Sequence, residues 1–283
     1  TMTRTVLITG CSSGIGRSLA LELHNRGLKV YATARRPETL DDLEQRGLKI
    51  LGLDVNDDTS IAAAMTQVES DVGQLDMLVN NAGFSQVGAI VDLQREDLRQ
   101  QYETNVIAPV AVTRAALPLM RKAVAANGAA DLVNVGSIVG LLTTPFAGAY
   151  CSSKACVHSI TDALRMELAP FGIRTITIQP GGVRSSFGDH AEEGMRLPEG
   201  SVYEPMQARI QARAQAGQQG ATPTDEFIKP VVDKLLKAKP PMVIRGGKGS
   251  FLLVTLKRFL PARAFDQLMA KRFGLAGFQP GEG

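Results

Sequence analysis

The sequence predicts an α/β fold, a single doubly wound domain built on a parallel sheet and followed by a helical extension. Short apolar runs alternate with helix-length segments along most of the 283 residues, which is typical of strand–helix–strand units. The runs are almost continuously apolar, as strands are when helices cover both faces of their sheet. No repeat, low-complexity segment or linker divides the chain, so we expect residues 1–283 to form one domain.

Each element follows from the local pattern of apolar, glycine and proline residues. Strands are expected at Thr5–Thr9, Lys29–Ala34, Lys49–Leu53, Met77–Asn80, Asp131–Val135, Arg174–Gln179 and Met242–Ile244. Helical patterns lie near residues 15–26, 38–46, 58–72, 95–125, 150–170 and 224–238. Residues 186–220 lack a clear period and are interpreted as a substrate loop or lid. In the extension, residues 246–283, one helix face is expected to carry Phe265, Leu268, Met269 and Phe273.

The composition excludes several classes of protein. With 44% hydrophobic and 21% charged residues and no long apolar run, the chain is not expected to span a membrane. No secretory signal precedes the first strand, and three cysteines are too few for a disulfide framework, so we expect a cytoplasmic location. The three histidines, His24, His158 and His190, lack metal-ligand spacing, so no metal is expected. Nothing in the sequence suggests a nucleic-acid-binding module.

A glycine-rich loop follows the first strand and opens the first helix. Its residues are Thr9-Gly10-Cys11-Ser12-Ser13-Gly14-Ile15-Gly16. Gly10 permits a tight turn, Gly14 lets the backbone approach a pyrophosphate, and Gly16 lets helix and strand pack closely. The free N–H groups at the helix start face the anion. Because the strand–loop–helix context is met, the loop predicts a dinucleotide site of the Rossmann type.

The end of the second strand indicates which dinucleotide binds. An NAD site usually places an acidic residue there for the ribose 2′-hydroxyl, but this chain has Ala34 followed by Arg35 and Arg36. Arg35, helped by Ser12 and by Arg36, is suited to a 2′-phosphate, which predicts NADP(H). The alternative is that both arginines are surface charges at the start of a loop.

The Gly-Cys-Ser-Ser-Gly-Ile-Gly spacing resembles the short-chain dehydrogenase/reductase family, and later motifs support the resemblance. These are Asp54-Val55, Asn80-Asn81-Ala82-Gly83 and Pro180-Gly181-Gly182-Val183-Arg184-Ser185, with Ser185 where the family more often has threonine. The resemblance runs from about Thr5 to Ser185. It implies that Asp54 and Val55 contact adenine and that Val183 and Ser185 hold the nicotinamide carboxamide. The expected cofactor site combines residues of the glycine loop and of these motifs with Arg35, Tyr150 and Lys154. Its residues are Gly10, Ser12, Ser13, Gly14, Ile15, Gly16, Arg35, Asp54, Val55, Asn81, Ala82, Gly83, Tyr150, Lys154, Pro180, Gly181, Val183 and Ser185.

Four residues make up the expected catalytic set. Tyr150 and Lys154 stand at i and i+4, on one face of a helix, and Ser137 follows the fifth strand at the same rim of the sheet. A nearby ammonium and the positive nicotinamide should lower the pKa of Tyr150, which makes it general acid in reduction and general base in oxidation. Ser137 would donate a hydrogen bond to the developing oxyanion. The resemblance implies that Lys154 binds the nicotinamide ribose and that Asn105 holds a water linking Lys154 to solvent.

The substrate is less well determined. Residues 4–16 and 29–33 resemble the 17β-hydroxysteroid and retinol dehydrogenase branch, which implies a bulky apolar ketone, aldehyde or alcohol. The apolar residues Phe146, Phe187, Met195, Leu197, Tyr203 and Met206 either line an apolar pocket or pack under a long loop. Alternatives are a reductase of carrier-bound 3-oxoacyl groups and a non-catalytic NADPH-sensing regulator.

The other expected partners involve the surface of the protein. We expect a homo-oligomer. The segment Phe251–Phe273 mixes apolar with basic side chains, so it could contact a membrane surface as a peripheral helix, although docking on its own domain or on a second subunit is favoured.

Overall fold

Seven parallel strands form one sheet in the order β3-β2-β1-β4-β5-β6-β7. They are β1 (Thr5–Ile8), β2 (Lys29–Ala34), β3 (Lys49–Gly52), β4 (Met77–Asn80), β5 (Ala130–Val135), β6 (Ile173–Pro180) and β7 (Val243–Gly246). The computed structural model describes residues 3–185 and 187–279. It confirms the predicted α/β class, and each strand overlaps its predicted position.

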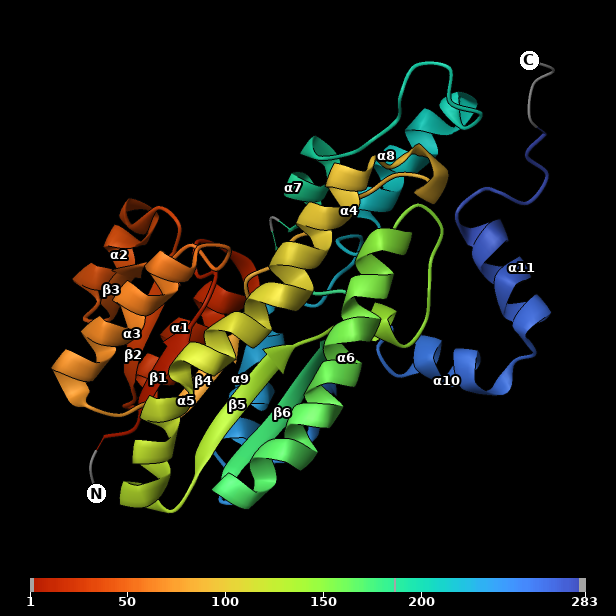
Figure 1. Cartoon of the computed structure of the whole chain (residues 1–283). Helices are drawn as coiled ribbons and strands as arrows, with labels where there is room; N and C mark the ends of the chain where they lie inside the picture. The colour runs from red at the N-terminus through yellow and green to blue at the C-terminus, as the bar shows by residue number, and fades with distance from the viewer. Residues whose placement is uncertain (1–2, 186, 280–283) are drawn as a thin grey trace.

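Helices cover both faces of the sheet (Figure 1). They are α1 (Gly14–Asn25), α2 (Asp41–Gln45), α3 (Asp58–Val72), α4 (Arg95–Tyr102), α5 (Ala108–Asn127), α6 (Gly148–Leu168), α7 (Phe187–Glu193), α8 (Gln207–Gln215), α9 (Thr224–Leu235), α10 (Leu252–Phe259) and α11 (Ala262–Arg272). Apolar residues of α1, α2 and α9 share one core cluster, whereas those of α3, α5 and α6 share the other. In β1, Val6 and Ile8 belong to the first cluster and Leu7 to the second, because successive side chains point to opposite faces.

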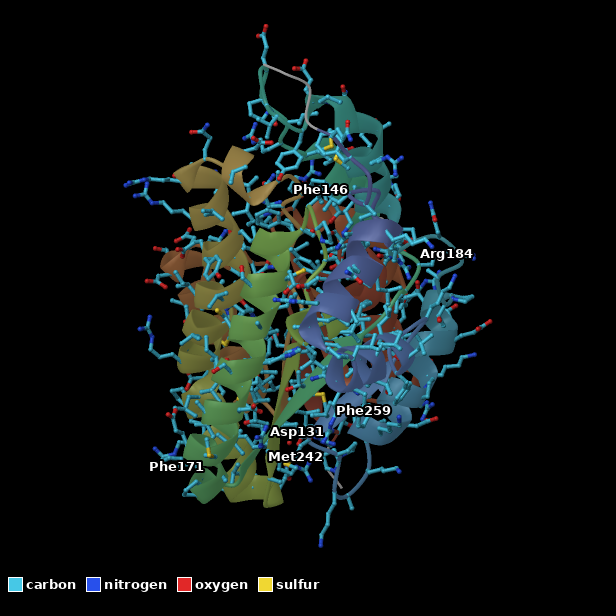
Figure 2. All side chains as sticks on the ribbon, turned by 90° about the vertical axis from the view of Figure 1, so that its right-hand side faces the viewer. Asp131, Phe146, Phe171, Arg184, Met242 and Phe259 are labelled. Atoms are coloured by element: carbon cyan, nitrogen blue, oxygen red, sulfur yellow. The ribbon has the colours of Figure 1, made fainter. Side chains whose placement is uncertain are left out.

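The order of the strands determines where a ligand can bind. The chain winds from β1 outward to β2 and β3, then returns to β4 on the other side of β1 and continues through β5, β6 and β7. The loops after β1 and β4 therefore diverge at the carboxyl end of the sheet and leave a crevice between them. Phe146 lies near this end, at the top of Figure 2, and Asp131, at the start of β5, lies near the opposite end.

Two expectations about helices were wrong. The pattern at 95–125 predicts one helix, but the π-helical turn η3 (Glu103–Ile107) separates α4 from α5. Residues 186–220 were expected to be irregular, yet α7 and α8 lie there. Met206, Ile210 and Ala214, spaced by four, are buried beside Phe146. Polar residues and glycines surround these three apolar positions, so the sequence shows no clear helical period there. The helix is recognised only from its packing in the folded chain.

The C-terminal extension packs against the domain largely as predicted. Phe265 and Met269 of α11 are buried with Leu142, and Phe273 packs on the same cluster. Leu268 was expected on that face, but its side chain is 39% exposed. It is three residues after Phe265, at the margin of a narrow apolar stripe, so only part of its surface is covered.

Candidate active site

A cleft of about 980 Å³ opens over the carboxyl ends of the strands. Almost every residue of the predicted cofactor and catalytic set lines it, namely Gly10, Ser12, Ser13, Gly14, Ile15, Arg35, Asp54, Val55, Asn81, Ala82, Gly83, Ser137, Tyr150, Lys154, Pro180, Gly181, Val183 and Ser185. Two predicted residues, Gly16 and Asn105, are not part of its wall. Segments that lie far apart in the sequence are therefore brought together at one rim.

The glycine loop adopts the conformation that its glycines permit. Gly10 and Gly14 have φ values of 70° and 59°, a region that residues with a Cβ rarely enter. Gly16 lies under the loop, where an added Cβ would come within 2.2 Å of Asn81 Nδ2. Ser13 precedes α1, but its side chain makes no capping hydrogen bond, so it does not occupy the first N–H groups of the helix. These groups are available to an anion such as a pyrophosphate.

Asn81 braces the glycine loop. Its Nδ2 donates hydrogen bonds to the carbonyl oxygens of Thr9, at 3.0 Å, and of Gly10, at 2.9 Å. The Thr9 hydroxyl accepts hydrogen bonds from the N–H groups of Asn81 and Ala82 at 3.0 Å. The loops after β1 and β4 are thereby locked together, and the floor of the crevice has a fixed shape.

At the part of the cleft beside β2, Arg35 is an exposed cation. It directly follows Ala34, the last residue of β2, and takes part in none of the ion pairs or side-chain hydrogen bonds found among the described residues. Arg36, by contrast, does not line the cleft. Opposite them, Asp54 accepts a hydrogen bond from the Asn56 N–H at 3.0 Å, which shapes the turn after β3.

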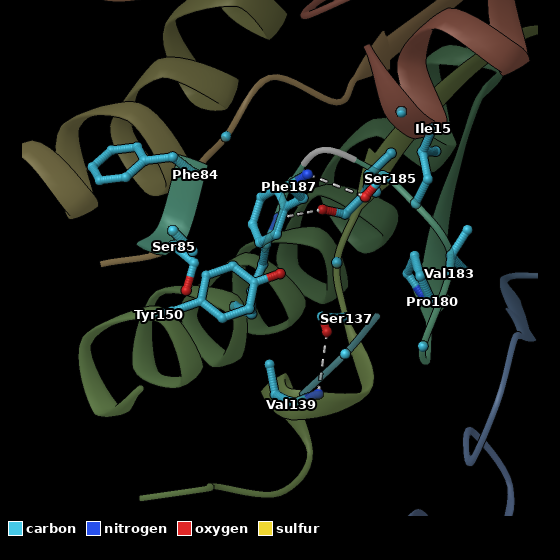
Figure 3. Close-up of a pocket in the computed structure, with 18 of the residues that line it drawn as sticks. Ile15, Phe84, Ser85, Ser137, Val139, Tyr150, Pro180, Val183, Ser185 and Phe187 are labelled. Atoms are coloured by element: carbon cyan, nitrogen blue, oxygen red, sulfur yellow. Dashed lines mark hydrogen bonds between the residues drawn. The ribbon is translucent and has the colours of Figure 1, made fainter. Parts of the chain in front are cut away.

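Tyr150 and Ser137 meet at the centre of the cleft (Figure 3). The Ser137 hydroxyl accepts a hydrogen bond from the Val139 N–H at 3.3 Å, as the cap of the short helix η4 (Ile138–Gly140). The serine is thus both a helix cap and a member of the site. Because its oxygen accepts from Val139, its own proton can point into the cleft, toward Tyr150 or a substrate oxygen.

Lys154 is buried beneath Tyr150. Its Nζ donates a hydrogen bond to the Val135 carbonyl at 2.7 Å and lies 5.9 Å from the centre of the Tyr150 ring. Burial lowers the pKa of Lys154 to about 8. Lys154 lines the cleft, and its ammonium lies at the end of β5, where a bound ligand could contact it.

The groups of the chain itself raise the pKa of Tyr150, whereas the expected lowering also counted the positive charge of the nicotinamide. Burial raises the pKa of Tyr150 to about 12, and a hydrogen bond with Ser137 and the charge of Arg213 oppose this only partly. The Lys154 ammonium donates its hydrogen bond to the Val135 carbonyl. Tyr150 is thus a protonated phenol, which is the form a proton donor requires.

Asn105 lies behind the cleft, in the π-helical turn η3. Its Oδ1 accepts from the Phe84 N–H at 3.1 Å, and its Nδ2 donates to the Phe84 carbonyl and to Ser153 Oγ, both at 3.0 Å. The side-chain amide is therefore committed to the protein. It anchors the loop after β4 to α6, the helix that carries Tyr150 and Lys154.

Comparison with known proteins identifies this arrangement. The family described as short chain dehydrogenase matches residues 4–196. The chain belongs to the short-chain dehydrogenase/reductase family. Among curated relatives, the short-chain dehydrogenase cctT of Talaromyces islandicus is 33% identical over 97% of this chain and 96% of its own. The oxidoreductase YbbO of Escherichia coli is 33% identical over 95% and 94%.

Solved structures of similar proteins share this fold. A short-chain dehydrogenase from Streptomyces avermitilis has a TM-score of 0.79 and 29% identity, with 99% of both chains covered. A family member from Burkholderia phymatum, in complex with NAD, has a TM-score of 0.78 at 22% identity. A serine dehydrogenase complexed with NADP⁺ has a TM-score of 0.73 at 25% identity, with 86% and 94% covered. The similar structures thus include one complex with NAD and one with NADP⁺.

In this family member, the structure adds two residues that the sequence did not single out. Arg213 of α8 lines the cleft, and His158 of α6 accepts a hydrogen bond from the Ser137 N–H through Nε2 at 3.3 Å. The segment 207–214 reads Gln-Ala-Arg-Ile-Gln-Ala-Arg-Ala, so Arg209 and Arg213 have nearly identical neighbours. No signal in the sequence separates the arginine in the cleft from the exposed one.

The apolar residues expected near the substrate divide into two groups. Phe187 lines the cleft, and its ring centre lies 5.5 Å from that of Tyr150. Phe146, Met195, Leu197, Tyr203 and Met206 instead form a separate cluster beneath α7 and α8. These five residues therefore pack under the loop, which was one of the two expected alternatives. Phe187 lines the pocket, which was the other.

Proposed function

We propose that this short-chain dehydrogenase/reductase is an NADP(H)-dependent enzyme that interconverts an alcohol with a bulky, largely apolar ketone or aldehyde. The observation that carries the proposal is the convergence of Ser137, Tyr150 and Lys154 on one cleft that also contains the glycine loop and Arg35. Bound NADPH would supply the hydride that the carbonyl carbon accepts. The residues of the chain supply binding, orientation and the proton.

Each catalytic side chain has a role that its surroundings support. Tyr150 donates the phenolic proton to the substrate oxygen as that oxygen gains negative charge, and Ser137 donates a hydrogen bond to the same oxygen. Lys154 binds the ribose hydroxyls and returns a proton to the phenolate. Because the Asn105 side chain is already satisfied, its proposed relay water would be held by the main chain of the π-helical turn.

The preference for NADP(H) rests on the end of β2. Ala34 occupies the position of the usual acidic residue, and Arg35 at the cleft wall is free to pair with a 2′-phosphate. The glycine loop supports a pyrophosphate, since φ of Gly10 and Gly14 is positive and the start of α1 is not capped by a side chain. The residues present therefore fit the cofactor.

The apolar substrate is supported by the other half of the cleft. This half is lined by Val139, Leu142, Phe187, Leu252, Leu253 and Met269. Three of these residues, Leu252, Leu253 and Met269, come from α10 and α11 of the extension, which cover the cleft from the side. This cover favours a compact small molecule over a carrier-bound acyl group. A screen of NADPH consumption over steroids, retinoids, long-chain ketones and acyl thioesters tests the proposal. Tight NADPH binding without turnover of any carbonyl compound would favour a sensing role instead.

The extension is proposed to dock on its own domain rather than on a membrane. Phe265 and Met269 are buried against Leu142, and Phe251 and Phe259 are left exposed at 64% and 76%. None of the helices in the described part of the chain has the length and apolar character to cross a bilayer. Flotation with anionic lipid vesicles tests this, because recovery of the protein with the vesicles would show membrane contact.

A further inference from the structure

Arg213 occupies an unusual position on the substrate side of the cleft. It lies on α8, lines the cleft with Tyr150 and Phe273, and is partly buried. Its Nε and one terminal nitrogen donate hydrogen bonds to Thr144 Oγ1 at 3.1 and 2.7 Å. The guanidinium carbon lies 5.4 Å from the centre of the Phe273 ring. Two contacts thus hold the cation in place against the wall.

No carboxylate neutralises this cation within the part of the chain whose side chains are described. The ion pairs there involve other arginines and lysines. A second cation lies nearby instead: the Arg272 guanidinium carbon is 5.9 Å from the same Phe273 ring, and Arg272 lines the same cleft. Burial lowers the pKa of Arg213, and the charge of Arg272 lowers it further. Phe273 is half-buried and Arg272 is exposed, so the two like charges repel each other at the cleft wall, and an anion bound between them would offset this repulsion.

The free donors of Arg213 fit a carboxylate. A guanidinium has five N–H groups, and Thr144 takes one from Nε and one from a terminal nitrogen. The other terminal nitrogen has no hydrogen-bond partner among the described residues. Planar N–H pairs of this kind bind carboxylates with two parallel hydrogen bonds. The neighbouring wall is apolar, with Leu142, Leu253 and Met269, so a ligand here would combine an apolar body with an acidic group.

Resting on the proposed reductase activity, we propose that the substrate is an oxo acid whose carboxylate binds Arg213, with Arg272 as a second, more exposed cation. The carbonyl carbon takes a hydride from bound NADPH, its oxygen takes the phenolic proton of Tyr150, and the product is the hydroxy acid with NADP⁺. The carboxylate is unchanged.

The test compares acids with their neutral esters. The probes are phenyl-substituted oxo acids, with zero, two or three methylene groups between carboxylate and carbonyl, each paired with its methyl ester. For the wild-type holoenzyme we expect kcat/KM to favour the acid over the ester in at least one pair. In R213M this ratio should fall by at least about tenfold, as for loss of a charge-assisted hydrogen-bond pair. R213K keeps the positive charge but loses the planar pair of N–H donors, so its ratio of acid to ester should lie between those of the wild type and R213M.

Arg209 provides the matched control. It lies one helical turn earlier on α8, in the same Gln-Ala-Arg context, but is exposed and outside the cleft. R209M should keep the wild-type ratio of acid to ester. Fluorescence titration with NADPH and the Tm of each variant show whether the cofactor site and the fold are intact. If R213M does not fold, the acid-to-ester ratio is compared between the wild type and R213K.

The outcomes separate the two proposals. Efficient reduction of esters with no preference for any acid, or a ratio unchanged in R213M and R213K, overturns the acid site and leaves the reductase. Loss of NADPH affinity in R213M without a change in the ratio also overturns it. If no carbonyl compound is turned over but the acids, and not the esters, raise the Tm of the NADPH complex, the reductase proposal fails and the acid site is supported.

Discussion

Tyr150, the proposed proton donor, shows how burial selects one protonation state of a side chain. Burial raises its pKa to about 12, and the side chain lies in the cleft with Ser137, Phe187 and Arg213. The residue is therefore ready to donate a proton at any physiological pH. Accepting one, as oxidation of an alcohol requires, depends on the positive charge that the oxidised cofactor would add.

Replacing Tyr150 with phenylalanine should stop turnover. Y150F removes the proton donor but keeps the ring, so kcat should fall by about 10²- to 10⁴-fold while the Kd for NADPH stays within about twofold. Steady-state kinetics and fluorescence titration measure the two quantities. Activity near the wild-type level would rule out Tyr150 as proton donor.

The proposed preference for NADP(H) depends on Arg35. R35D replaces the proposed phosphate-binding cation with the acid typical of NAD sites, so the ratio of kcat/KM for NADPH to that for NADH should fall by about 10²-fold or more. R36D is the matched control, since Arg36 is adjacent but not in the cleft wall. An unchanged ratio in R35D would mean that Arg35 is a surface charge.

Among the elements, η4 and α6 together position Ser137. Nε2 of His158, on α6, accepts from the Ser137 N–H, and Gly136 and Gly140 make room for the imidazole, because a Cβ on either would come within 2.6 Å of it. Burial lowers the pKa of His158 to about 4, and the charges of Lys154 and Arg245 contribute while Asp162 opposes them. The imidazole is therefore neutral, as an acceptor must be.

The stability of the protein should reflect this depressed pKa. As pH falls from about 6.5 to 4, His158 gains a proton in the unfolded chain but not in the folded one, so the free energy of unfolding decreases. Between pH 7.5 and pH 5 the loss should be roughly 1–2 kcal/mol. H158Q keeps an acceptor but does not titrate, so its loss over this range should be smaller by that amount. Urea denaturation at the two pH values measures it, and identical losses in both proteins would contradict the neutral, buried imidazole.

At the scale of the whole molecule, a rigid sheet holds the cofactor half of the cleft, and the C-terminal helices complete the substrate half. The sheet and its two core clusters draw on strands and helices throughout residues 5–244. The cluster of Phe265, Met269 and Leu142 is small and separate. Such satellite clusters can open without unfolding the whole protein.

F265A should therefore loosen the substrate half alone. Phe265 is 1% exposed, and its truncation should cost about 3–5 kcal/mol, enough to detach α11 locally. We expect a several-fold rise in KM for apolar substrates and faster proteolysis after β7, with NADPH affinity unchanged. F259A is the control, because Phe259 is 76% exposed and its truncation should change neither KM nor the rate of proteolysis. A fall in NADPH affinity for F265A would show that the two halves are coupled.

The sequence by itself determined the sheet, the glycine loop and which residues form the proposed catalytic trio. These follow from local patterns: near-continuous apolar strands, glycines at positions 10 and 14 where φ is positive, and Tyr150 and Lys154 one helical turn apart. A parallel sheet then places all strand ends at one rim, which is why Ser137 reaches Tyr150 from another element.

Only the tertiary structure decided the rest. Packing distinguishes Arg213 from Arg209, covers one face of α8, and commits the Asn105 amide to Phe84 and Ser153. Burial, which no local pattern reports, raises the pKa of Tyr150. Each of these properties depends on groups distant in sequence that meet at one place, so the chemistry of the substrate side could be read only after the chain was folded.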